Sequence, residues 1–394
     1  MLDPRTDAAF LARNVAAVHP EGALEARLAA AAKEDRPLRV KLGIDPTAPD
    51  IHLGHVVVLQ KLREFQDLGH RVVLIIGDYT ARVGDPSGRS ATRPVLTGEV
   101  IEHNATTYRD QAKRVLDQDP ALLEVRRNGE WLDMPMDRFL TLARIPKVAQ
   151  LLERDDFHKR FTANKPISLL ELLYPLLQGY DSVAVDADVE IGGTDQTFNL
   201  LFGRDVQRAE GKPEQAVLTM PLLVGTDGVQ MSKSLGNHIG ITEPPEEIFG
   251  RTMRIPDETI ATWSALLGID LSRWPESEPR ERKRALARSL CDRFAGLGAG
   301  DRAQEAFDRV FRDKAIPDEI PEHALEDGDQ VHLPAVLASA FGVSRSDARR
   351  AIEQGGVRVD GEVWPAGSFD ADRDQVIDRA LQMGKRRFVR LRQG

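Results

Sequence analysis

The apolar positions in the first part of the chain form short continuous runs separated by a helically spaced stretch. Arg39 to Ile44 predicts a short apolar strand, and Arg71 to Ile76 is nearly all apolar, as a central strand of a parallel sheet should be. Between them, Leu53 to Leu68 has apolar residues at helical spacing, with Asp50 as a candidate N-cap and Gly69 as its end. This order predicts a βαβ unit, in which ligands bind beyond the carboxyl ends of the strands.

The pattern changes along the rest of the chain. Leu116 to Phe161 is mostly helical and predicts an insertion between two halves of the sheet. Leu218 to Val224 predicts a later strand, and Pro244 to Phe311 predicts helices. Ala315 to Gln330 is acidic and contains two prolines, which is typical of a linker.

We therefore predict an α/β fold in three parts. Residues 1–243 form a Rossmann-like, parallel-sheet catalytic domain that binds a nucleotide and carries the inserted helical segment at roughly 90–190. Residues 244–330 form an α-helical domain and the linker. Residues 331–394 form a small α+β module.

Two histidines lie at the start of the helix in the predicted βαβ unit. His52 and His55 are three residues apart, on one face at the start of the predicted helix, where free N–H groups and the helix dipole favour phosphate. Gly54 between them removes a side chain where a ligand would approach. Alone, this short string is also consistent with two surface histidines.

A second short string lies about 175 residues further along. Met231-Ser232-Lys233-Ser234 belongs to a stretch, Gly225 to Asn237, with glycines near both ends, as suits a mobile loop. A lysine there can meet a polyphosphate in the transition state, although most loop lysines are simply solvated. The two strings in this order predict a site that holds a triphosphate from two sides.

Two further strings place carboxylates beside glycines. Gly192-Gly193 allows close backbone approach, and Asp195 just after it can accept hydrogen bonds from a ribose. Asp85 follows Gly84 beyond the end of a central strand, where substrates bind in open α/β sheets, but the string is also that of an ordinary turn.

The stretch from Pro166 to Tyr180 predicts a mainly apolar helix with one polar stripe. Its members Glu171, Tyr174, Gln178 and Asp181 are spaced 3, 4 and 3 residues apart. Such a stripe is either the solvent edge of a core helix or the polar lining of a pocket, in which a ligand would satisfy the buried carboxylate and amide.

Composition narrows the class of protein. Of 394 residues, 41% are hydrophobic and 29% are charged, as in ordinary globular proteins. The net charge of −9 excludes a uniformly basic nucleic-acid binder but leaves room for a local basic patch. Cys291 is the only cysteine, so an intrachain disulfide is excluded and a cysteine-based zinc site is unexpected. Without a long apolar run or a signal-peptide core, we expect a cytoplasmic protein with no membrane partner.

The last part of the chain is basic. Val331 to Gly394 holds 11 Lys and Arg against 8 Asp and Glu, a net charge of +3, so the rest carries −12. Ser344 or Ser346 predicts the cap of a helix that ends at Gly355, and a hairpin turn follows. A basic face on an acidic protein indicates phosphate contacts, with a solvated tail as the alternative.

Together these residues resemble the class I aminoacyl-tRNA synthetases, and within them the bacterial tyrosyl-tRNA synthetases, over nearly the whole chain. The first family string matches Asp45-Pro46-Thr47 through His55, and the second matches Met231 to Ser234. All of class I shares these two strings. The assignment to tyrosine rests on the helix with Tyr174, Gln178 and Asp181, and on Ser344 to Gly361, which resembles a ribosomal-protein-type RNA-binding module.

The resemblance implies ATP-dependent attachment of tyrosine to tRNA(Tyr) in two steps, through tyrosyl-adenylate and transfer to the 3′-terminal adenosine. The substrate carboxylate is itself the nucleophile, so positioning and electrostatic stabilisation replace a general base. Mg²⁺ accompanies ATP, and no fixed metal site in the protein is expected. The implied partners are tyrosine, ATP, tRNA(Tyr) and a second copy of the chain, without DNA.

The resemblance also implies roles for the matching residues. The pentacovalent phosphorus and the leaving pyrophosphate are stabilised by Thr47, His52, His55 and Lys233. The other ATP contacts come from Gly43, Asp45, Gly54, Gly192, Asp195, Met231, Ser232 and Ser234, with Asp195 on the ribose. The tyrosine contacts come from Lys41, Asp85, Tyr174, Gln178, Asp181 and Gln196. In this set, Asp181 accepts the phenol proton, and Tyr174, Gln178 and Asp85 hold the ammonium.

Beyond the catalytic site, the resemblance implies RNA contacts and a dimer. The RNA contacts come from Arg345, Arg349, Arg350, Lys385, Arg386 and Arg387. The dimer forms through the inserted segment, about Asn128 to Asp156.

Two positions depart from the family pattern. Lys41 stands where well-known members carry a tyrosine beside the substrate phenol, which puts phenol recognition in question. Gln230 replaces the usual first lysine of the second string and removes one positive charge near the phosphates. We expect slower activation rather than loss of activity, because Lys233 remains.

Three other functions fit part of the sequence. A tryptophanyl-tRNA synthetase shares the fold and both strings, but normally lacks the RNA module and the Tyr174 and Asp181 pair. A small-molecule nucleotidyltransferase of the same superfamily explains the ATP strings but not the module. A non-catalytic RNA-binding paralogue would have lost His52, His55 or Lys233, and all three are present.

Overall fold

The chain forms two compact units. One comprises residues 1–244 and 251–295, and the other comprises residues 245–250 and 296–394. The computed structural model describes residues 3–87, 97–311, 320–326, 328–384 and 387–393.

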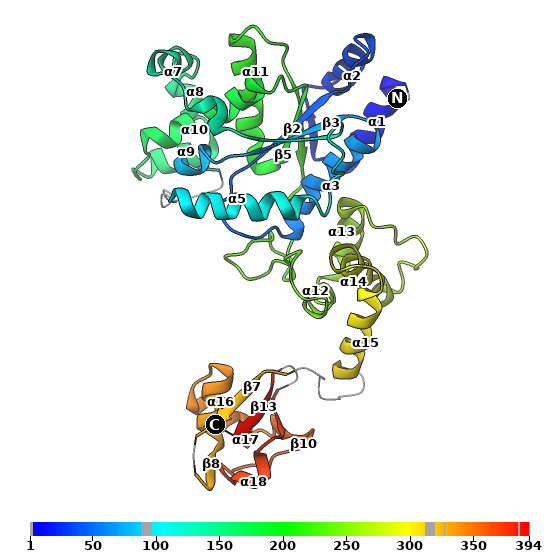
Figure 1. The fold of residues 1–394 in the computed structure, drawn as a ribbon, viewed down its shortest axis with the longest axis vertical. Coiled ribbons are helices and arrows are strands. Elements are labelled where there is room, and N and C mark those ends of the chain that lie inside the picture. The colour runs from blue at the N-terminus through cyan, green and yellow to red at the C-terminus, as the bar shows by residue number, and fades with distance from the viewer. Residues whose placement is uncertain (1–2, 88–96, 312–319, 327, 385–386, 394) are drawn as a thin grey trace. The chain divides into compact units, whose positions relative to one another are not determined.

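A six-stranded sheet forms the centre of the first unit (Figure 1). Its strands lie in the order β1–β6–β5–β2–β3–β4. Strands β2 to β6 are parallel to one another, and β1 is antiparallel to β6. The bounds are β1 (Ala17–His19), β2 (Arg39–Ile44), β3 (Arg71–Ile76), β4 (Leu123–Arg127), β5 (Val189–Gly193) and β6 (Ala216–Met220).

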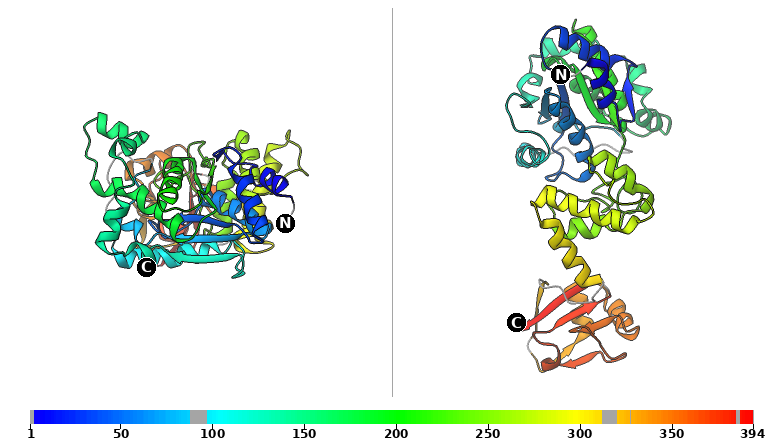
Figure 2. Two further views of the ribbon diagram at one scale, coloured as in Figure 1. Left: turned by 90° about the horizontal axis from the view of Figure 1, so that it is seen from above. Right: turned by 90° about the vertical axis from the view of Figure 1, so that its right-hand side faces the viewer.

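Helices surround this sheet (Figure 2). Two of them, α3 and α11, pack directly on its strands. From α11, the buried side chain of Leu200 lies against Gly192 of β5. The helices of this unit are α1 (Pro4–Leu11), α2 (Ala23–Lys33), α3 (Leu53–Asp67), α4 (Thr80–Val83), α5 (Gly98–Ala112), α6 (Gly129–Leu132), α7 (Met136–Leu142), α8 (Val148–Leu152), α9 (Asp155–Thr162), α10 (Leu169–Ala184), η1 (Thr194–Gln196), α11 (Thr197–Ala209), η2 (Asp257–Thr259), α13 (Ile260–Leu267) and α14 (Pro279–Ala295). No helix in the described ranges is long and apolar enough to cross a membrane.

The strand order changes direction between β2 and β5. Strands β3 and β4 extend the sheet on one side of β2, while β5 and β6 extend it on the other. Only Val40 with Val189 and Lys41 with Glu190 pair across the junction, so the two strands separate toward their carboxyl ends. Ligands of open α/β sheets bind at such a point.

The predicted α/β fold is confirmed, and β2 and β3 have the predicted bounds. Two local expectations are wrong. Helix α3 is capped by His52 rather than Asp50. The predicted helical insertion contains strand β4, an edge strand whose five residues are all half-buried and include three charged ones, so its sequence lacks the apolar run of a central strand.

The second unit contains a five-stranded sheet in the order β10–β9–β12–β13–β7 and a separate pair of strands, β8 and β11. Its apolar core includes Leu337 of α16, Ile352 of α17 and Leu391 of β13. The elements are α12 (Pro245–Thr252), which begins in this unit, α15 (Ala299–Phe311), β7 (Glu322–Leu325), β8 (Gln330–His332), α16 (Leu333–Phe341), α17 (Arg345–Glu353), β9 (Val357–Val359), β10 (Glu362–Val363), β11 (Asp370–Asp372), α18 (Arg373–Val376), β12 (Ala380–Met383) and β13 (Arg387–Gln393).

The predicted C-terminal helix and hairpin are present, with Ser344 as the helix cap. The predicted linker is partly wrong, because β7 lies inside it and pairs in parallel with β13. Residues 312–319 of that linker lie outside the described ranges. The compact units also divide the predicted helical domain, with α13 and α14 in the first and α15 in the second. The limits 1–243, 244–330 and 331–394 stay a prediction.

Candidate active site

A cavity of about 340 Å³ opens where β2 and β5 separate. Residues from both strand ends and from the starts of α3 and η1 line it, together with one face of α10. Of the residues predicted from the sequence, those that line it are Gly43, Asp45, Thr47, His52, Gly54, His55, Asp85, Tyr174, Gln178, Asp181, Gly192, Asp195, Gln196 and Met231. Lys41, Ser232, Lys233 and Ser234 do not line it.

The two histidines cap helix α3 with their rings. His52 Nδ1 accepts from Gly54 N at 3.1 Å, and His55 Nδ1 accepts from His52 N at 3.3 Å. A neutral imidazole that accepts at Nδ1 carries its proton on Nε2. Both rings therefore keep an Nε2–H donor for a ligand. Gly54 is needed here, because a Cβ at that position would lie 2.9 Å from the His52 ring.

Both rings are neutral at physiological pH. Burial, helped by the nearby His55, lowers the pKa of His52 to about 2. Burial and the positive charge of Lys233 lower the pKa of His55 to about 4. Each ring is thus a neutral hydrogen-bond donor, which can stabilise phosphate oxygens without first losing or gaining a proton.

Lys233 lies near these histidines without lining the cavity. Its Nζ is shielded from solvent and has no hydrogen-bond partner within the described ranges; Asp50 Oδ2 lies 3.8 Å away. Burial lowers the pKa of Lys233, an effect that Asp50 partly offsets. A shielded cation without a close partner is suited to a polyphosphate.

The loop that carries Lys233 is held by Asn237. Its Oδ1 accepts from Ser232 N at 2.8 Å, and its Nδ2 donates to Asp227 Oδ1 at 2.8 Å. Ser232 and Ser234 share a hydrogen bond between their hydroxyls at 2.8 Å. The serines therefore shape the loop in this structure, and ATP contacts from them stay a prediction.

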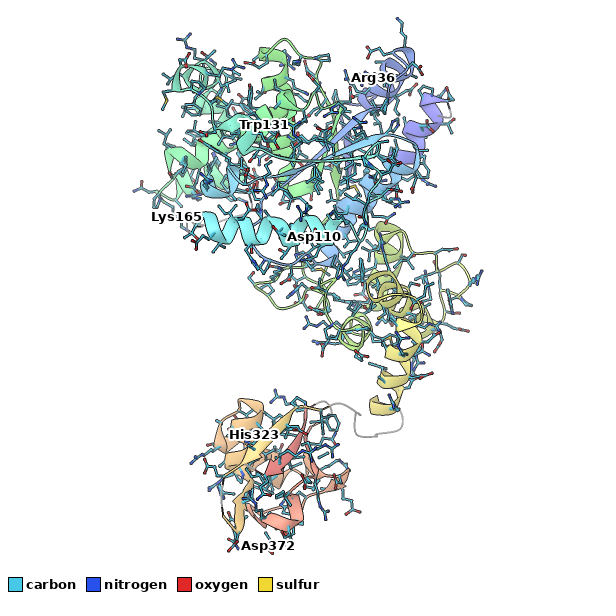
Figure 3. All side chains as sticks on the ribbon, viewed as in Figure 1. Arg36, Asp110, Trp131, Lys165, His323 and Asp372 are labelled. Atoms are coloured by element: carbon cyan, nitrogen blue, oxygen red, sulfur yellow. The ribbon has the colours of Figure 1, made fainter. Side chains whose placement is uncertain are left out.

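Asp181 lines the cavity from helix α10. Trp131 Nε1 (the residue labelled in Figure 3) donates to its Oδ1 at 2.8 Å, and Asn128 Nδ2 donates to its Oδ2 at 3.3 Å. Because both neighbours donate, this position must offer two acceptor oxygens, which a carboxylate does and an amide does not. Burial raises the pKa of Asp181 to about 7, although Lys41, Trp131 and Asn128 act in the opposite direction.

Tyr174 of α10 also lines the cavity and is hydrogen-bonded to the loop after β2. Its hydroxyl donates to Asp45 Oδ2 at 2.9 Å, and Thr80 Oγ1 donates to Asp45 Oδ1 at 2.7 Å. Burial, with the negative charge of Asp45, holds the pKa of Tyr174 well above its usual value. Tyr174 is therefore a fixed, neutral phenol whose oxygen still has a lone pair for a ligand donor.

Asp85 and Gln196 form a second polar group in the cavity. Gln196 Nε2 donates to Asp85 Oδ2 at 2.8 Å, and the other oxygen of Asp85 accepts from Ser87 Oγ at 2.6 Å. Arg154, the N-cap residue of α9, donates to Ser87 Oγ at 2.6 Å and to Asn199 Oδ1 at 2.9 Å. A buried cation from the insertion thus fixes the loop that presents Asp85.

Gly193, the last residue of β5, makes room for Asp195. A Cβ at Gly193 would collide with Asp195 Oδ1, so any larger residue there would displace the carboxylate. Burial raises the pKa of Asp195, which Gln196 partly offsets by donating at 3.2 Å.

The structure corrects the expectation for Lys41. This side chain is fully buried, and its Nζ lies 2.8 Å from Glu190 Oε1, away from the cavity lining. Lys41 therefore does not line the cavity, whereas Glu190 does. Glu171 also leaves the predicted polar stripe, because it pairs with Arg160 at 2.8 Å.

Several site residues were not predicted. Thr80, Asn128 and Glu190 line the cavity, and Trp131 and Arg154 hold its lining residues. Asn104 and Gln111 of α5 fix the loop before α3 through Pro46 O and Ile51 N. These residues are scattered and share no spacing, so only the fold brings them together.

No group of three His, Cys, Asp or Glu side chains in the described ranges is placed to hold a metal ion.

The second unit presents the predicted RNA-contacting arginines. Arg345, Arg349 and Arg350 are exposed on α17, and Arg387 is exposed at the start of β13. Arg349 also lies over the ring of Phe369, 5.2 Å from its centre. Lys385 and Arg386 lie outside the described residues.

The similarity of the chain to known proteins identifies its family. Residues 33–312 match the family described as tRNA synthetases class I (W and Y). The chain belongs to this family. Residues 333–364 also match the S4 domain, which coincides with α16, α17, β9 and β10.

Two relatives within the family cover nearly the same length. The tyrosine--tRNA ligase of Thermotoga maritima is 48% identical over 406 residues, which cover 100% of this chain and 99% of that protein. The tyrosine--tRNA ligase of Bordetella avium is 50% identical over 370 residues, 90% of this chain and 88% of that protein. These relatives confirm the resemblance to bacterial tyrosyl-tRNA synthetases.

Solved structures share the fold. The mitochondrial tyrosyl-tRNA synthetase of Aspergillus nidulans, truncated at its C-terminus, superposes with a TM-score of 0.63 at 20% identity, covering 79% of this chain and 95% of that one. The tyrosyl-tRNA synthetase of Archaeoglobus fulgidus complexed with L-tyrosine gives a TM-score of 0.61 at 21% identity, covering 77% and 99%.

Proposed function

We propose that this chain attaches tyrosine to tRNA(Tyr) with ATP, through tyrosyl-adenylate. One observation carries the proposal. A single cavity joins the carboxylate of Asp181, suited to a phenol, to the Nε2–H donors of His52 and His55, suited to a phosphate. The relatives named tyrosine--tRNA ligase support the same reaction, and nothing favours tryptophan or a non-catalytic role.

In the first step, a carboxylate oxygen of tyrosine attacks the α-phosphorus of ATP. A bond forms between that oxygen and phosphorus, while the bond from phosphorus to the bridging oxygen of pyrophosphate breaks. Negative charge grows on the phosphate oxygens, where His52 and His55 donate and Lys233 offers its positive charge. Thr47 lines the cavity beside them.

The tyrosine side chain lies toward Asp181, whose carboxylate accepts from the phenol O–H. Its ammonium lies toward Tyr174, Gln178 and Asp85. The ribose of ATP lies toward Asp195, and the backbone at Gly43, Gly54 and Gly192 permits its close approach. In this arrangement the reacting groups meet without any covalent enzyme intermediate.

In the second step, a hydroxyl of the terminal adenosine of tRNA attacks the carbonyl carbon of the adenylate. The new ester bond replaces the bond from that carbon to the phosphate oxygen, and AMP leaves. The test of the proposal is charging of tRNA(Tyr) with labelled tyrosine and ATP. Absence of charged tRNA at micromolar protein would reject the proposal.

Mg²⁺ would enter with ATP and neutralise part of the phosphate charge, and no residue of the protein is proposed to hold it. Gln230 lines the cavity at the loop and leaves a neutral amide where the family pattern has a lysine. The expected consequence stays slower activation. Because the reaction needs ATP and tRNA, the proposal places the chain in the cytoplasm.

The S4 domain is proposed to hold tRNA through phosphate contacts of the exposed arginines on α17 and β13. Deletion of residues 320–394 is expected to weaken tRNA charging about tenfold at moderate salt, because several cation–phosphate contacts are lost. The deletion must begin before Glu322, since β7 pairs with β13.

Pyrophosphate exchange, which needs no tRNA, is the internal control for this deletion. Its rate should stay within about twofold of the intact chain. An equal fall in exchange and charging would contradict an RNA-binding role for this module. The salt dependence of tRNA binding should also become less steep after the deletion.

A homodimer is proposed to form through the inserted segment, near Asn128 to Asp156. Elements α7, α8 and α9 lie on the same side of the first unit (Figures 1 and 2). They and the start of α10 expose an unusual number of large apolar side chains, as expected of a homodimer interface. These are Met136, Leu140, Val148, Phe161, Leu169 and Leu170.

Replacing Met136 and Val148, which are 68% and 62% exposed, with glutamate is expected to convert the dimer into monomers, because each charge would be desolvated in the interface. Sedimentation velocity at micromolar protein measures the outcome. Leu297→Glu is the matched control, because Leu297 is 93% exposed and belongs to the other compact unit. A monomeric unmodified chain would reject the proposed dimer.

A further inference from the structure

Lys41 and Glu190 form a buried ion pair beside the cavity. They are register partners in β2 and β5, and they are the last partners before these strands separate. Lys41 is 0% exposed and Glu190 is 1% exposed. Only Glu190 lines the cavity, so any effect of Lys41 on a ligand must pass through its neighbours.

The ammonium group of Lys41 is fully used. Its Nζ donates to Gln178 O and to Ser182 Oγ, each at 2.8 Å, and lies 2.8 Å from Glu190 Oε1. A lysine has three N–H donors, and these three acceptors match them. No donor of Lys41 is left for a substrate.

The carboxylate of Glu190 likewise has all of its acceptor positions occupied. Its Oε1 accepts from Lys41 and from Gln178 Nε2, the latter at 3.3 Å. Its Oε2 accepts from Ser182 Oγ at 3.2 Å and from Gln215 Nε2. Four accepted bonds match the capacity of an ionised carboxylate, which cannot donate.

This arrangement dictates the orientation of the Gln178 amide. Because Glu190 only accepts, Gln178 must turn its NH₂ group toward Glu190 and its carbonyl oxygen away. That oxygen, Oε1, is buried and has no hydrogen-bond partner within the described ranges. Gln178 itself lines the cavity, and a buried acceptor without a partner is costly until a ligand satisfies it.

We propose that Lys41 and Glu190 act as a positioning pair, which holds the carbonyl oxygen of Gln178 toward the ammonium group of bound tyrosine. The inference rests on the proposed function, because it takes tyrosine as the ligand. A glutamine at position 190 would both donate and accept, so the Gln178 amide could adopt either of two orientations. Lys41 is needed because an unpaired carboxylate at this depth would be very costly.

The test compares ligands with and without an amino group. The double variant Lys41→Met/Glu190→Gln removes both charges at similar volume and leaves the net charge unchanged. Binding is measured by calorimetry for tyrosine, for tyramine, and for 3-(4-hydroxyphenyl)propanoate, which lacks the amino group. We expect tyrosine and tyramine to bind about ten- to a hundredfold more weakly, as for a lost bond to a charged group, and the propanoate to change less than twofold.

Lys61→Met/Glu64→Gln is the matched control. Lys61 and Glu64 form another Lys–Glu ion pair of the same unit, 2.6 Å apart, with Lys61 fully buried and neither residue in the cavity lining. This variant should leave all three affinities unchanged. If the Lys41 and Glu190 variant does not fold, Glu190→Asp replaces it, because this change keeps the charge but withdraws the carboxylate from Gln178. Tyrosine and tyramine should again bind more weakly, and the propanoate should not.

Gln178→Leu distinguishes positioning from a general structural effect. In that background the Lys41 and Glu190 changes should no longer weaken tyrosine binding, because the group that they orient is absent. Equal weakening for all three ligands, or unchanged binding of the two amines, would overturn the inference. Failure of the unmodified chain to bind tyrosine would instead reject the proposed function.

Discussion

Lys233→Ala is expected to slow tyrosyl-adenylate formation by about 10²–10³-fold, or ~3–4 kcal/mol in the activation free energy. Lys233 Nζ is shielded and lacks a hydrogen-bond partner in the described ranges, with Asp50 as the nearest acid at 3.8 Å. It is therefore available to pair with the phosphates, and this attraction grows as negative charge develops on the leaving pyrophosphate. Single-turnover formation of the adenylate, followed by rapid quench, measures the effect.

The binding of tyrosine provides the control for this variant. Because Lys233 does not line the cavity, its loss should leave the equilibrium affinity for tyrosine within about twofold of the unmodified chain. Lys233→Arg keeps the charge on a larger head group and should recover part of the rate. An unchanged rate in Lys233→Ala would show that the second string plays no part in activation.

Asp181→Ala is expected to lower kcat/KM for tyrosine by about 10²–10³-fold, because the phenol loses a charged acceptor and becomes buried without a partner. Activation of phenylalanine, which has no hydroxyl, should change little or improve. The selectivity for tyrosine over phenylalanine should therefore collapse. Sites of this kind reject phenylalanine by about 10⁵-fold, a value that comes from a well-studied tyrosyl enzyme rather than from this structure.

The same carboxylate predicts a pH dependence. Burial raises the pKa of Asp181 to about 7, so the charged form predominates above pH 7 and is lost as the pH falls below it. The affinity for tyrosine should fall between pH 8 and pH 6, since bonds to a charged acceptor are roughly twice as strong. His52 and His55 stay neutral in this range. Equal pH profiles for tyrosine and phenylalanine would contradict this role of Asp181.

The central strands could be predicted from the sequence because burial leaves a simple pattern. Strands β2 and β3 are covered on both faces, so their residues form apolar runs with clear ends. Strand β4 lies at the sheet edge, where charged residues are tolerated, and β7 lies in an acidic stretch. Neither has a pattern that differs from a loop, and only pairing with a neighbouring strand makes them strands.

The site could be predicted where polar residues recur at helical spacing. His52, His55 and the stripe from Tyr174 to Asp181 line the cavity as expected. The same spacing included Glu171, whose carboxylate instead pairs with Arg160, and periodicity alone does not separate the two cases. The ion pair between Lys41 and Glu190 could not be predicted from the sequence. Glu190 is distant in sequence and becomes the neighbour of Lys41 only through the register of β2 and β5.

The most direct test of the account is amino-acid-dependent exchange between ATP and pyrophosphate, measured without tRNA for tyrosine, phenylalanine and tryptophan. The cavity that Asp181, His52 and His55 line together predicts rapid exchange with tyrosine and little with the other two. Exchange with tryptophan or phenylalanine at a comparable rate, or no exchange with any of the three, would contradict it.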